Sequence, residues 1–181
     1  MDKQSLRQHA KKVRNGANSS QISTSICENI RKTPEFQNAK NIMIYYPFGS
    51  EINILELLED TSKNWILPKV TGEEIEVYFY DKDDFLSENQ WKIPEPCTEI
   101  KKTDKKVIDM VILPGLCADK KGFRIGYGMG FYDRFLRNVH KECVKLIPVV
   151  SELFIDEVPK DLWDEPLDIV VTEKEIFKIN A

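Results

Sequence analysis

Closely spaced cysteines are absent from this sequence of 181 residues. Its four cysteines lie far apart and form no C-x-x-C pair, which excludes the common zinc patterns and a disulfide-rich secreted scaffold. Histidine is scarce too, and neither His9 nor His140 lies beside Cys117, the cysteine in the most unusual stretch of the chain. We therefore expect reduced thiols and no Ser-His-Asp or Cys-His catalytic group.

Long hydrophobic runs and a strong excess of either charge are also missing. No apolar run approaches the roughly 18 residues of a membrane span, and the N-terminal segment MDKQSLRQHAKKVRNG lacks the apolar core of a signal peptide. The net charge of −4 gives no reason to expect nucleic acid or an anionic membrane as a partner. With 41% hydrophobic and 31% charged residues, the composition suits a soluble globular protein. We expect a cytoplasmic monomer that folds as one domain over residues 1–181.

Glycine is scarce outside one stretch, which holds five of the eight glycines. Leu113 to Leu136 reads LPGLCADKKGFRIGYGMGFYDRFL. The apolar run VIDMVIL at 107–113 predicts a buried strand, and the apolar spacing from Gly130 to Val139 predicts a helix. A glycine-rich loop between a strand and a helix is typical of phosphate binding. Backbone N–H groups can approach an anion there, and the helix start adds partial positive charge.

The glycine spacing matches neither common phosphate loop. Gly126-x-Gly128-x-Gly130 is one residue too tight for the dinucleotide fingerprint, and no Gly-Lys-Ser/Thr triplet follows it. The charged neighbours are more informative. Arg124 can bind phosphate oxygens in bidentate fashion, and a carboxylate such as Asp133 beside phosphates suits Mg²⁺. The alternative is a flexible connector with a solvated basic rim.

The rest of the chain alternates between helix and strand patterns. Apolar periodicity predicts helices over Lys3–Val13 and Asn18–Lys32 and another after Asn53, with strands at Asn41–Phe48, Trp65–Val70, Ile75–Tyr80, Cys143–Val150 and Leu167–Thr172. This order predicts an α/β fold, namely a single-domain, three-layer, open and mostly parallel sheet with helices on both faces. Ligand-binding loops are then expected at the carboxyl ends of the strands.

The glycine-rich stretch resembles the signature of the 5-formyltetrahydrofolate cyclo-ligase family, which has an Arg-x-Gly-Tyr-Gly-x-Gly-x-Tyr-Asp-Arg core after a Pro-Gly strand end. Further pieces of the resemblance spread over nearly the whole chain. Glu51-Ile52-Asn53-Ile54 corresponds to a Glu-Val-Asp-Thr motif of which only the Glu is retained. The segment from Trp91 to Pro96 resembles a Gly-Ile-x-Glu-Pro motif, with Lys92 in place of the Gly.

The resemblance implies an ATP- and Mg²⁺-dependent ligase of folate and one-carbon metabolism. Such an enzyme converts 5-formyltetrahydrofolate and MgATP to 5,10-methenyltetrahydrofolate, ADP and phosphate. The family's ATP site implies a matching set here: Lys3, Arg7, Arg124, Ile125, Gly126, Tyr127, Gly128, Met129, Gly130, Phe131 and Tyr132. Arg124 and Tyr127 are the expected catalytic residues.

The same resemblance implies residues for the folate and for the metal ion. The expected folate residues are Tyr46, Glu51, Trp91, Tyr127, Gly128, Met129, Gly130 and Phe131. Glu51 would accept hydrogen bonds from the two neighbouring N–H donors of the amino-pyrimidine edge. Asp133 and Asp168 would hold Mg²⁺.

Structural interpretations of the same residues stay open at this point. Lys3 and Arg7 also fit a solvated helix face, while Tyr46 and Trp91 fit a buried strand face and a core anchor. Asp168 also fits a residue that caps the start of a strand. Two other functions are open as well: a different ATP-dependent enzyme on the same fold, and a non-catalytic nucleotide- or folate-binding module.

Overall fold

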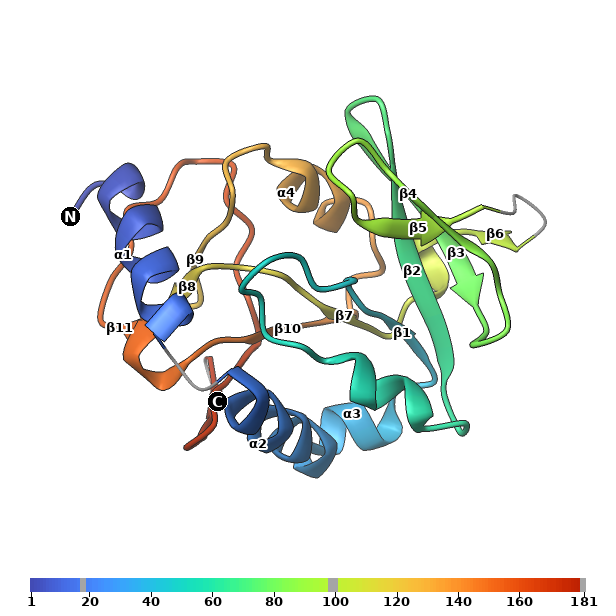
Figure 1. Cartoon of the computed structure of the whole chain (residues 1–181), viewed down its shortest axis with the longest axis horizontal. Coiled ribbons are helices and arrows are strands. Elements are labelled where there is room, and N and C mark those ends of the chain that lie inside the picture. Colours follow the sequence, from blue (N-terminus) through green and yellow to red (C-terminus); the bar gives the residue numbers. More distant parts are fainter. Residues whose placement is uncertain (17–18, 98–100, 180–181) are drawn as a thin grey trace.

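The centre of the molecule is an eight-stranded sheet (Figure 1). The computed structural model describes residues 1–16, 19–97 and 101–179. The sheet strands are β1 (Asn41–Met43), β2 (Asn64–Thr71), β3 (Glu74–Tyr80), β6 (Lys102–Thr103), β7 (Met110–Ile112), β10 (Val144–Pro148), β12 (Ile169–Val171) and β13 (Ile176–Lys178). They lie in the order β13-β12-β10-β7-β1-β2-β3-β6. The five strands from β12 to β2 pair in parallel, and β13, β3 and β6 add antiparallel edges.

Helices cover both faces of this sheet. They are α1 (Lys3–Gly16), α2 (Ser19–Lys32), α3 (Pro34–Asn38) and α4 (Phe131–Leu136). Adjacent residues of β1 point to opposite faces, as strand geometry requires: Ile42 packs in one core cluster with residues of α1, α2 and α3, and Met43 packs in a second cluster with Phe135 and Leu136 of α4. Figure 1 shows α4 on one side of the sheet and α2 and α3 on the other. The three-layer α/β prediction is confirmed.

Short elements complete the fold. A three-stranded sheet is formed by β8 (Cys117–Asp119), β9 (Arg124–Ile125) and β11 (Phe154–Ile155), and a hairpin by β4 (Leu86–Glu88) and β5 (Pro94–Pro96). Three 3₁₀ turns are η1 (Leu55–Glu59), η2 (Lys105–Val107) and η3 (Ser151–Leu153). Neither of the two smaller sheets was predicted, because their short strands lack a clear hydrophobic period and β11 pairs with the distant β8. No helix within the described ranges is long and apolar enough to cross a membrane.

Several predicted elements are shorter than expected. The strand predicted to reach Phe48 ends at Met43, where the chain turns out of the sheet and the Tyr45 hydroxyl donates to the carbonyl of Ile52 over 2.8 Å. The helix predicted after Asn53 is only the 3₁₀ turn η1. The second predicted helix is observed from Ser19, and its first predicted residue lies outside the described residues.

The direction of the parallel strands sets where ligands can bind. All five point the same way, so the segments that follow β1, β7 and β10 leave from one edge of the sheet. The glycine-rich stretch follows β7 and therefore starts from that edge. Open α/β sheets bind ligands at this edge, because the loops there are free to diverge from the packed core.

Candidate active site

A cavity of about 390 Å³ lies at the carboxyl edge of the parallel strands. Its walls come from the segment after β1, from β2 at Pro68, from the segment after β7 at Pro114, from α1 and from residues 161–164. The residues predicted for ATP and folate line this cavity: Lys3, Arg7, Tyr46, Glu51, Trp91 and all of residues 124–132. Asp133 lines it too. Side chains separated by more than a hundred positions in the sequence thus meet in one place.

The glycine-rich loop, residues 126–130, forms one wall of the cavity. Gly128 and Gly130 have φ angles of +99° and +67°, a left-handed backbone that side chains disfavour. A Cβ on Gly128 would lie 3.1 Å from Nη2 of Arg7. Nε of the same arginine donates to the carbonyl oxygen of Gly126 over 2.9 Å. The loop therefore carries a guanidinium from α1 directly against its backbone.

Arg124 is the buried cation of this wall. Its side chain is 5% exposed, and its Nη2 lies 3.1 Å from Oδ1 of Asp133. Nη1 is buried and has no hydrogen-bond partner among the described residues. A buried donor without a partner is costly, so a phosphate or carbonyl oxygen in the cavity would be bound favourably at this atom.

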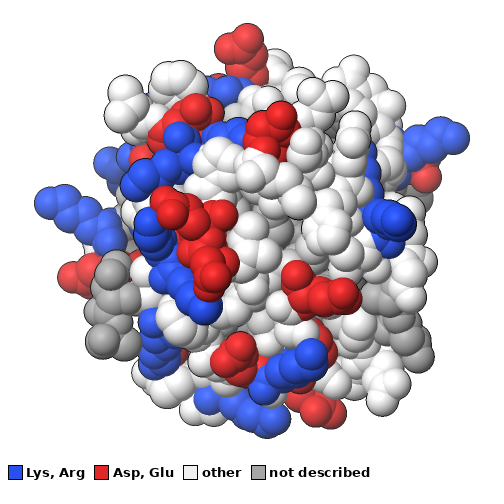
Figure 2. Space-filling model, turned by 90° about the vertical axis from the view of Figure 1, so that its left-hand side faces the viewer, with Lys and Arg blue, Asp and Glu red and all other residues white. Residues whose placement is uncertain are grey.

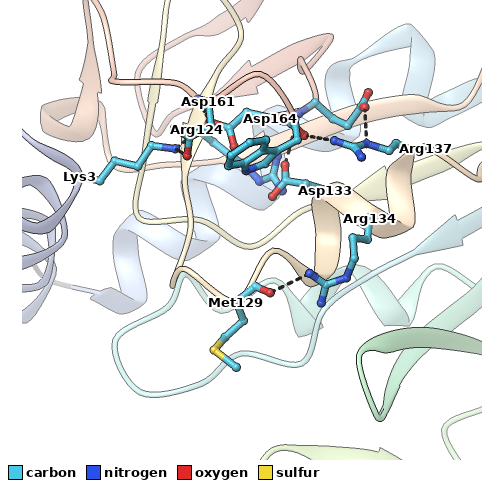
Figure 3. Close-up of polar contacts among 10 residues, drawn as sticks. Lys3, Arg124, Met129, Asp133, Arg134, Arg137, Asp161 and Asp164 are labelled. Atoms are coloured by element: carbon cyan, nitrogen blue, oxygen red, sulfur yellow. Dashed lines mark hydrogen bonds and ion pairs between the residues drawn. The ribbon is translucent and has the colours of Figure 1, made fainter.

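A second cation, Lys3 of α1, holds the segment of residues 161–165, here called the strap. Its Nζ donates to Oδ2 of Asp161 over 2.8 Å and to Oδ2 of Asp164 over 2.9 Å. Burial acts to lower the pKa of Lys3, but the two carboxylates outweigh it and the pKa is raised. Arg137, just after α4, donates to the carbonyl of Trp163 over 2.7 Å. Figure 3 shows the strap residues held between Lys3 and Arg137, beside Arg124.

Two carboxylates of the cavity suit a magnesium ion. Asp133 and Asp164 both line it, and both already face cations, Arg124 and Lys3 respectively. Across the part of the chain that is described, no group of three or more His, Cys, Asp or Glu forms a ready-made metal cluster. Mg²⁺ does not need one when phosphates supply the remaining oxygen ligands.

Glu51 belongs to the wall formed by the segment after β1 and is set among polar groups. Burial raises its pKa, while hydrogen bonds from Phe48 and Tyr127 and the charge of Arg14 act to lower it. The Phe48 N–H donates to Oε2 over 2.8 Å. Burial, followed by the charge of Glu51, raises the pKa of Tyr127 to about 12. Arg14 is itself buried, and its Nε donates to the carbonyl of Ser50 over 2.7 Å, which fixes the turn that carries Glu51.

The aromatic residues predicted for folate lie on the cavity surface. Trp91 is 37% exposed and packs edge-on against Phe131, with ring centroids 6.2 Å apart. Tyr46 is half-buried and lines the cavity. Neither residue belongs to the two core clusters, so the core-anchor interpretation of Trp91 is wrong. The strand-face interpretation of Tyr46 is wrong as well, because β1 ends at Met43.

Asp168 does not lie with the other predicted residues. It comes just before β12, at the amino edge of the sheet, and is not among the residues that line the cavity. Its Oδ2 accepts a hydrogen bond from the Lys145 backbone N–H over 2.7 Å. Asp109 has the same place before β7, and its Oδ2 accepts from the N–H groups of Lys40 and Asn41. The strand-start interpretation of Asp168 therefore describes its position.

Several cavity residues were not singled out in the sequence. They are Glu95, Asp161, Trp163 and Asp164, with Arg14 supporting the wall behind Glu51. Asp164 lies four positions before Asp168, the acidic residue near the end of the chain that the sequence analysis singled out. Glu95 belongs to the Trp91–Pro96 segment that already carried the resemblance, which was a usable signal.

Comparison with known proteins agrees with the geometry. The model of the 5-formyltetrahydrofolate cyclo-ligase family matches residues 1–173. The chain belongs to this family. Its curated members include a probable 5-formyltetrahydrofolate cyclo-ligase of Schizosaccharomyces pombe, 29% identical over 175 residues and covering 86% of each chain. The 5-formyltetrahydrofolate cyclo-ligase of Haemophilus influenzae is 29% identical over 181 residues, covering 93% of this chain and 97% of that one.

Solved structures give the same result for the fold. The 5,10-methenyltetrahydrofolate synthetase of Aquifex aeolicus superposes with a TM-score of 0.89 at 30% identity, covering 100% of this chain and 94% of that one. A 5,10-methenyltetrahydrofolate synthetase of Mycoplasma pneumoniae superposes with a TM-score of 0.73 at 23% identity. It covers 96% of this chain and 99% of that chain. The cyclo-ligase family fold is therefore present over the whole described chain.

Proposed function

We propose that this cyclo-ligase family member converts 5-formyltetrahydrofolate and MgATP to 5,10-methenyltetrahydrofolate, ADP and phosphate. The observation that carries the proposal is the cavity, whose lining contains a cationic, glycine-rich wall and, joined to it through Tyr127, a wall with a glutamate and aromatic side chains. The first wall suits a polyphosphate and the second suits a flat heterocycle with N–H donors. A ligase that joins these two substrates needs both walls in one cavity.

The chemistry explains why phosphate-binding groups dominate. The N5-formyl group is an amide whose oxygen leaves poorly. Transfer of the γ-phosphoryl group to that oxygen converts it into a good leaving group; N10 then attacks the formyl carbon and phosphate departs as the ring closes. Such a reaction depends on positioning and charge neutralisation rather than on a protein nucleophile.

Arg124 is the residue we assign to the transferred phosphoryl group. It is buried, and its unpartnered Nη1 offers a donor that no described protein atom satisfies. Lys3 and Arg7 bind and neutralise the rest of the polyphosphate along the backbone of residues 126–130, and Tyr127 and Tyr132 shape the pocket. Removing one donor aimed at developing charge typically costs about a hundredfold or more in kcat.

Magnesium fits the residues present. We assign Asp133 and Asp164 as its protein ligands, because both line the cavity beside the cationic wall while Asp168 does not. Held by these two carboxylates, Mg²⁺ would supply positive charge that neutralises the ATP phosphates. Lys3 and Arg124, the present partners of these two carboxylates, would then turn toward the phosphates themselves.

Glu51, Tyr46 and Trp91 are the residues we assign to the folate. The carboxylate of Glu51 accepts the N–H donors of the amino-pyrimidine ring, and Trp91 and Tyr46 contact the flat faces of the substrate. The fold and the reaction also suit a cytoplasmic enzyme that acts as a monomer, since one chain supplies both walls.

The direct test is near-ultraviolet absorbance of the purified protein with 5-formyltetrahydrofolate, ATP and Mg²⁺. We expect the methenyl chromophore to grow, and to stay absent when ATP or Mg²⁺ is omitted. A flat trace from protein that still binds MgATP would favour another ATP-dependent enzyme on this fold. Binding of both ligands without ADP release would favour a non-catalytic module.

A further inference from the structure

Glu95 is a buried carboxylate of the cavity that none of the roles above uses. The residue is 8% exposed, lies in β5 and lines the cavity. Glutamate is rarely buried unless it is paired with a cation. Within residues 1–16, 19–97 and 101–179, however, Glu95 makes no ion pair. A buried carboxyl group without an ion-pair partner points to a role in binding a ligand or in catalysis.

The hairpin holds this carboxylate in a fixed orientation through one oxygen. Oε1 accepts hydrogen bonds from the Val70 N–H over 3.1 Å and from Nδ2 of Asn89 over 2.8 Å. The same Asn89 organises the turn, because its Oδ1 accepts from the N–H groups of Trp91 and Ile93. Oε2 makes no hydrogen bond to the described residues and is not sealed from solvent. Because Glu95 lines the cavity, Oε2 is the oxygen available to a bound molecule.

Glu95 lines the same cavity as Arg124, Glu51 and Tyr132. The phenol of Tyr132 has its pKa raised by burial and then by the charge of Glu51, while Arg124 acts to lower it and Glu95 acts to raise it. Glu51, Arg124 and Glu95 therefore all act on this one phenol. Arg124, with its unpartnered Nη1, is the residue assigned to the transferred phosphoryl group. Because Glu95 lines the same cavity as Arg124, we assign its free carboxylate oxygen to the side of the formyl carbon and the attacking nitrogen.

Ring closure requires a proton acceptor at this point. N10 carries one hydrogen, and its lone pair forms the new bond to the formyl carbon. The proton leaves N10, the carbon–oxygen bond breaks, and phosphate departs with the bonding electrons. The product keeps one positive charge shared by N5 and N10. None of the residues assigned to ATP, Mg²⁺ or the folate accepts this N10 proton.

We propose that Glu95 accepts the N10 proton during ring closure, through Oε2, and so acts as a catalytic base in the second half of the reaction. This rests on the proposed function. Glu51 is less suited to the task, because hydrogen bonds from Phe48 and Tyr127 and the charge of Arg14 already engage it. Glu95 afterwards releases the proton to solvent, and its charge stabilises the cation that forms on the substrate.

The test is rapid-quench kinetics of the Glu95→Gln variant, with ADP and methenyl product measured separately. Gln keeps the shape and the acceptor for Val70 but cannot take a proton. We expect methenyl formation to fall about a hundredfold or more, while the first equivalent of ADP still forms quickly. Glu88→Gln, an exposed change on the same hairpin, is the matched control and should behave like wild type.

Two results would overturn the assignment: methenyl formation by Glu95→Gln within about threefold of wild type, or a parallel fall of ADP and methenyl, which indicates a binding role. Glu95→Ala offers a second test, because added formate can occupy the space of the missing carboxylate and should restore part of the ring closure. No effect of formate on this folded variant would count against the base. Failure of wild type to form any methenyl product would instead contradict the proposed function.

Discussion

Lys92, at the turn of the β4–β5 hairpin, has a φ of +61° and is the only non-glycine residue with a positive φ among those described. A left-handed backbone is costly for any residue with a Cβ, and glycine avoids this cost. Glycine is also the residue that the family motif has at this position. The lysine that stands in place of this glycine therefore introduces a small backbone strain at the turn.

Lys92→Gly should raise the free energy of unfolding by about 0.5–1 kcal/mol, because relief of strain exceeds the added flexibility of the unfolded chain. Urea denaturation measures this. Gln90→Gly, at an exposed neighbour without a positive φ, is the control and should lower stability. A loss of stability in both variants would show that the turn is not strained.

The buried carboxyl group of Glu51 makes the free energy of unfolding fall as the pH rises. Burial raises its pKa in the folded state above the ordinary value of 4.5. The folded state then holds the proton more tightly than the unfolded chain, so its stabilising contribution is complete below about pH 4.5 and is lost as the pH rises through the raised value. The Glu51→Gln variant has no ionisable group at this position, so it does not lose this stability as the pH rises.

We therefore expect Glu51→Gln to be more stable than wild type at pH 7 and to lose this advantage at pH 4, while folate turnover falls. Denaturation at the two pH values measures the first effect. The exposed Glu28→Gln on α2 should show no such pH-dependent gain. A constant difference at both pH values would mean that the carboxylate is not destabilised by burial.

Arg124→Ala should lower kcat by about a hundredfold or more, because it removes the buried donor aimed at the transferred phosphoryl group. It also leaves Asp133 without its ion-pair partner, so the unfolding free energy should fall by about 3 kcal/mol. Arg31→Ala breaks only the partly exposed pair with Glu56 and should keep wild-type turnover. Unchanged turnover in Arg124→Ala would contradict the assigned role.

At the scale of elements, α1 serves the site through its polar face. Leu6 and Ala10 bury the apolar face in the core, while Lys3 holds the strap and Arg7 holds the glycine-rich loop. The solvated-face interpretation of these two cations is wrong, because both contact backbone or carboxylate groups at the cavity. The helix is both a packing element and a wall of the site.

Lys3→Ala should raise the KM for ATP about tenfold or more, because it removes a phosphate cation and the anchor of the strap. The unfolding free energy should fall by about 1–3 kcal/mol, because the pair with Asp161 is partly exposed but Asp164 is left buried without its cation. Steady-state kinetics and denaturation measure the two effects. Lys11→Ala, an exposed lysine of the same helix, should change neither. An equal rise in KM there would point to general charge effects.

Elements with a strong local pattern could be predicted, and those made by distant pairing could not. The period of α1 and the alternation of β3 define these elements without help from the rest of the chain. The β4–β5 hairpin has no such pattern of its own, because a side-chain hydrogen bond between Asn89 and Glu95 holds it. The motif around Trp91 was the one signal for Glu95, and it was used for Trp91 alone.

At the scale of the molecule, MgATP should stabilise the fold by mass action. A ligand at about 100 times its Kd adds about 2.7 kcal/mol, which corresponds to a rise in Tm of about 5–10 °C for a chain of this size. Removal of Mg²⁺ with EDTA should abolish most of this rise. Differential scanning fluorimetry measures it.

The same measurement distinguishes Asp164 from Asp168 as the candidate magnesium ligand. Asp164→Asn should lose the Mg²⁺-dependent part of the rise, and Asp168→Asn should keep it and instead lower the Tm without ligand, because Asp168 accepts the Lys145 N–H. The opposite pattern would return the metal role to Asp168. The sequence alone could not distinguish the two aspartates, because they differ in the edge of the sheet at which each lies, and only the fold determines that edge.

Charge on the surface nearest α1 does not point to a further partner. On the face nearest α1, acidic and basic side chains alternate rather than gather into one area of a single sign (Figure 2). The useful charges are those brought to the cavity by the fold. The composition could narrow the class of protein, but it could not predict that these charged side chains lie together, because that depends on the order of the five parallel strands.

The ion pairs of Lys3 with Asp161 and Asp164 join positions 158 and 161 residues apart. During synthesis, therefore, Lys3 stays without these two partners until residues 161–164 have left the ribosome. A chain stalled before them could bury much of its core and still lack this anchor. The first helix and the strap thus meet only late in synthesis.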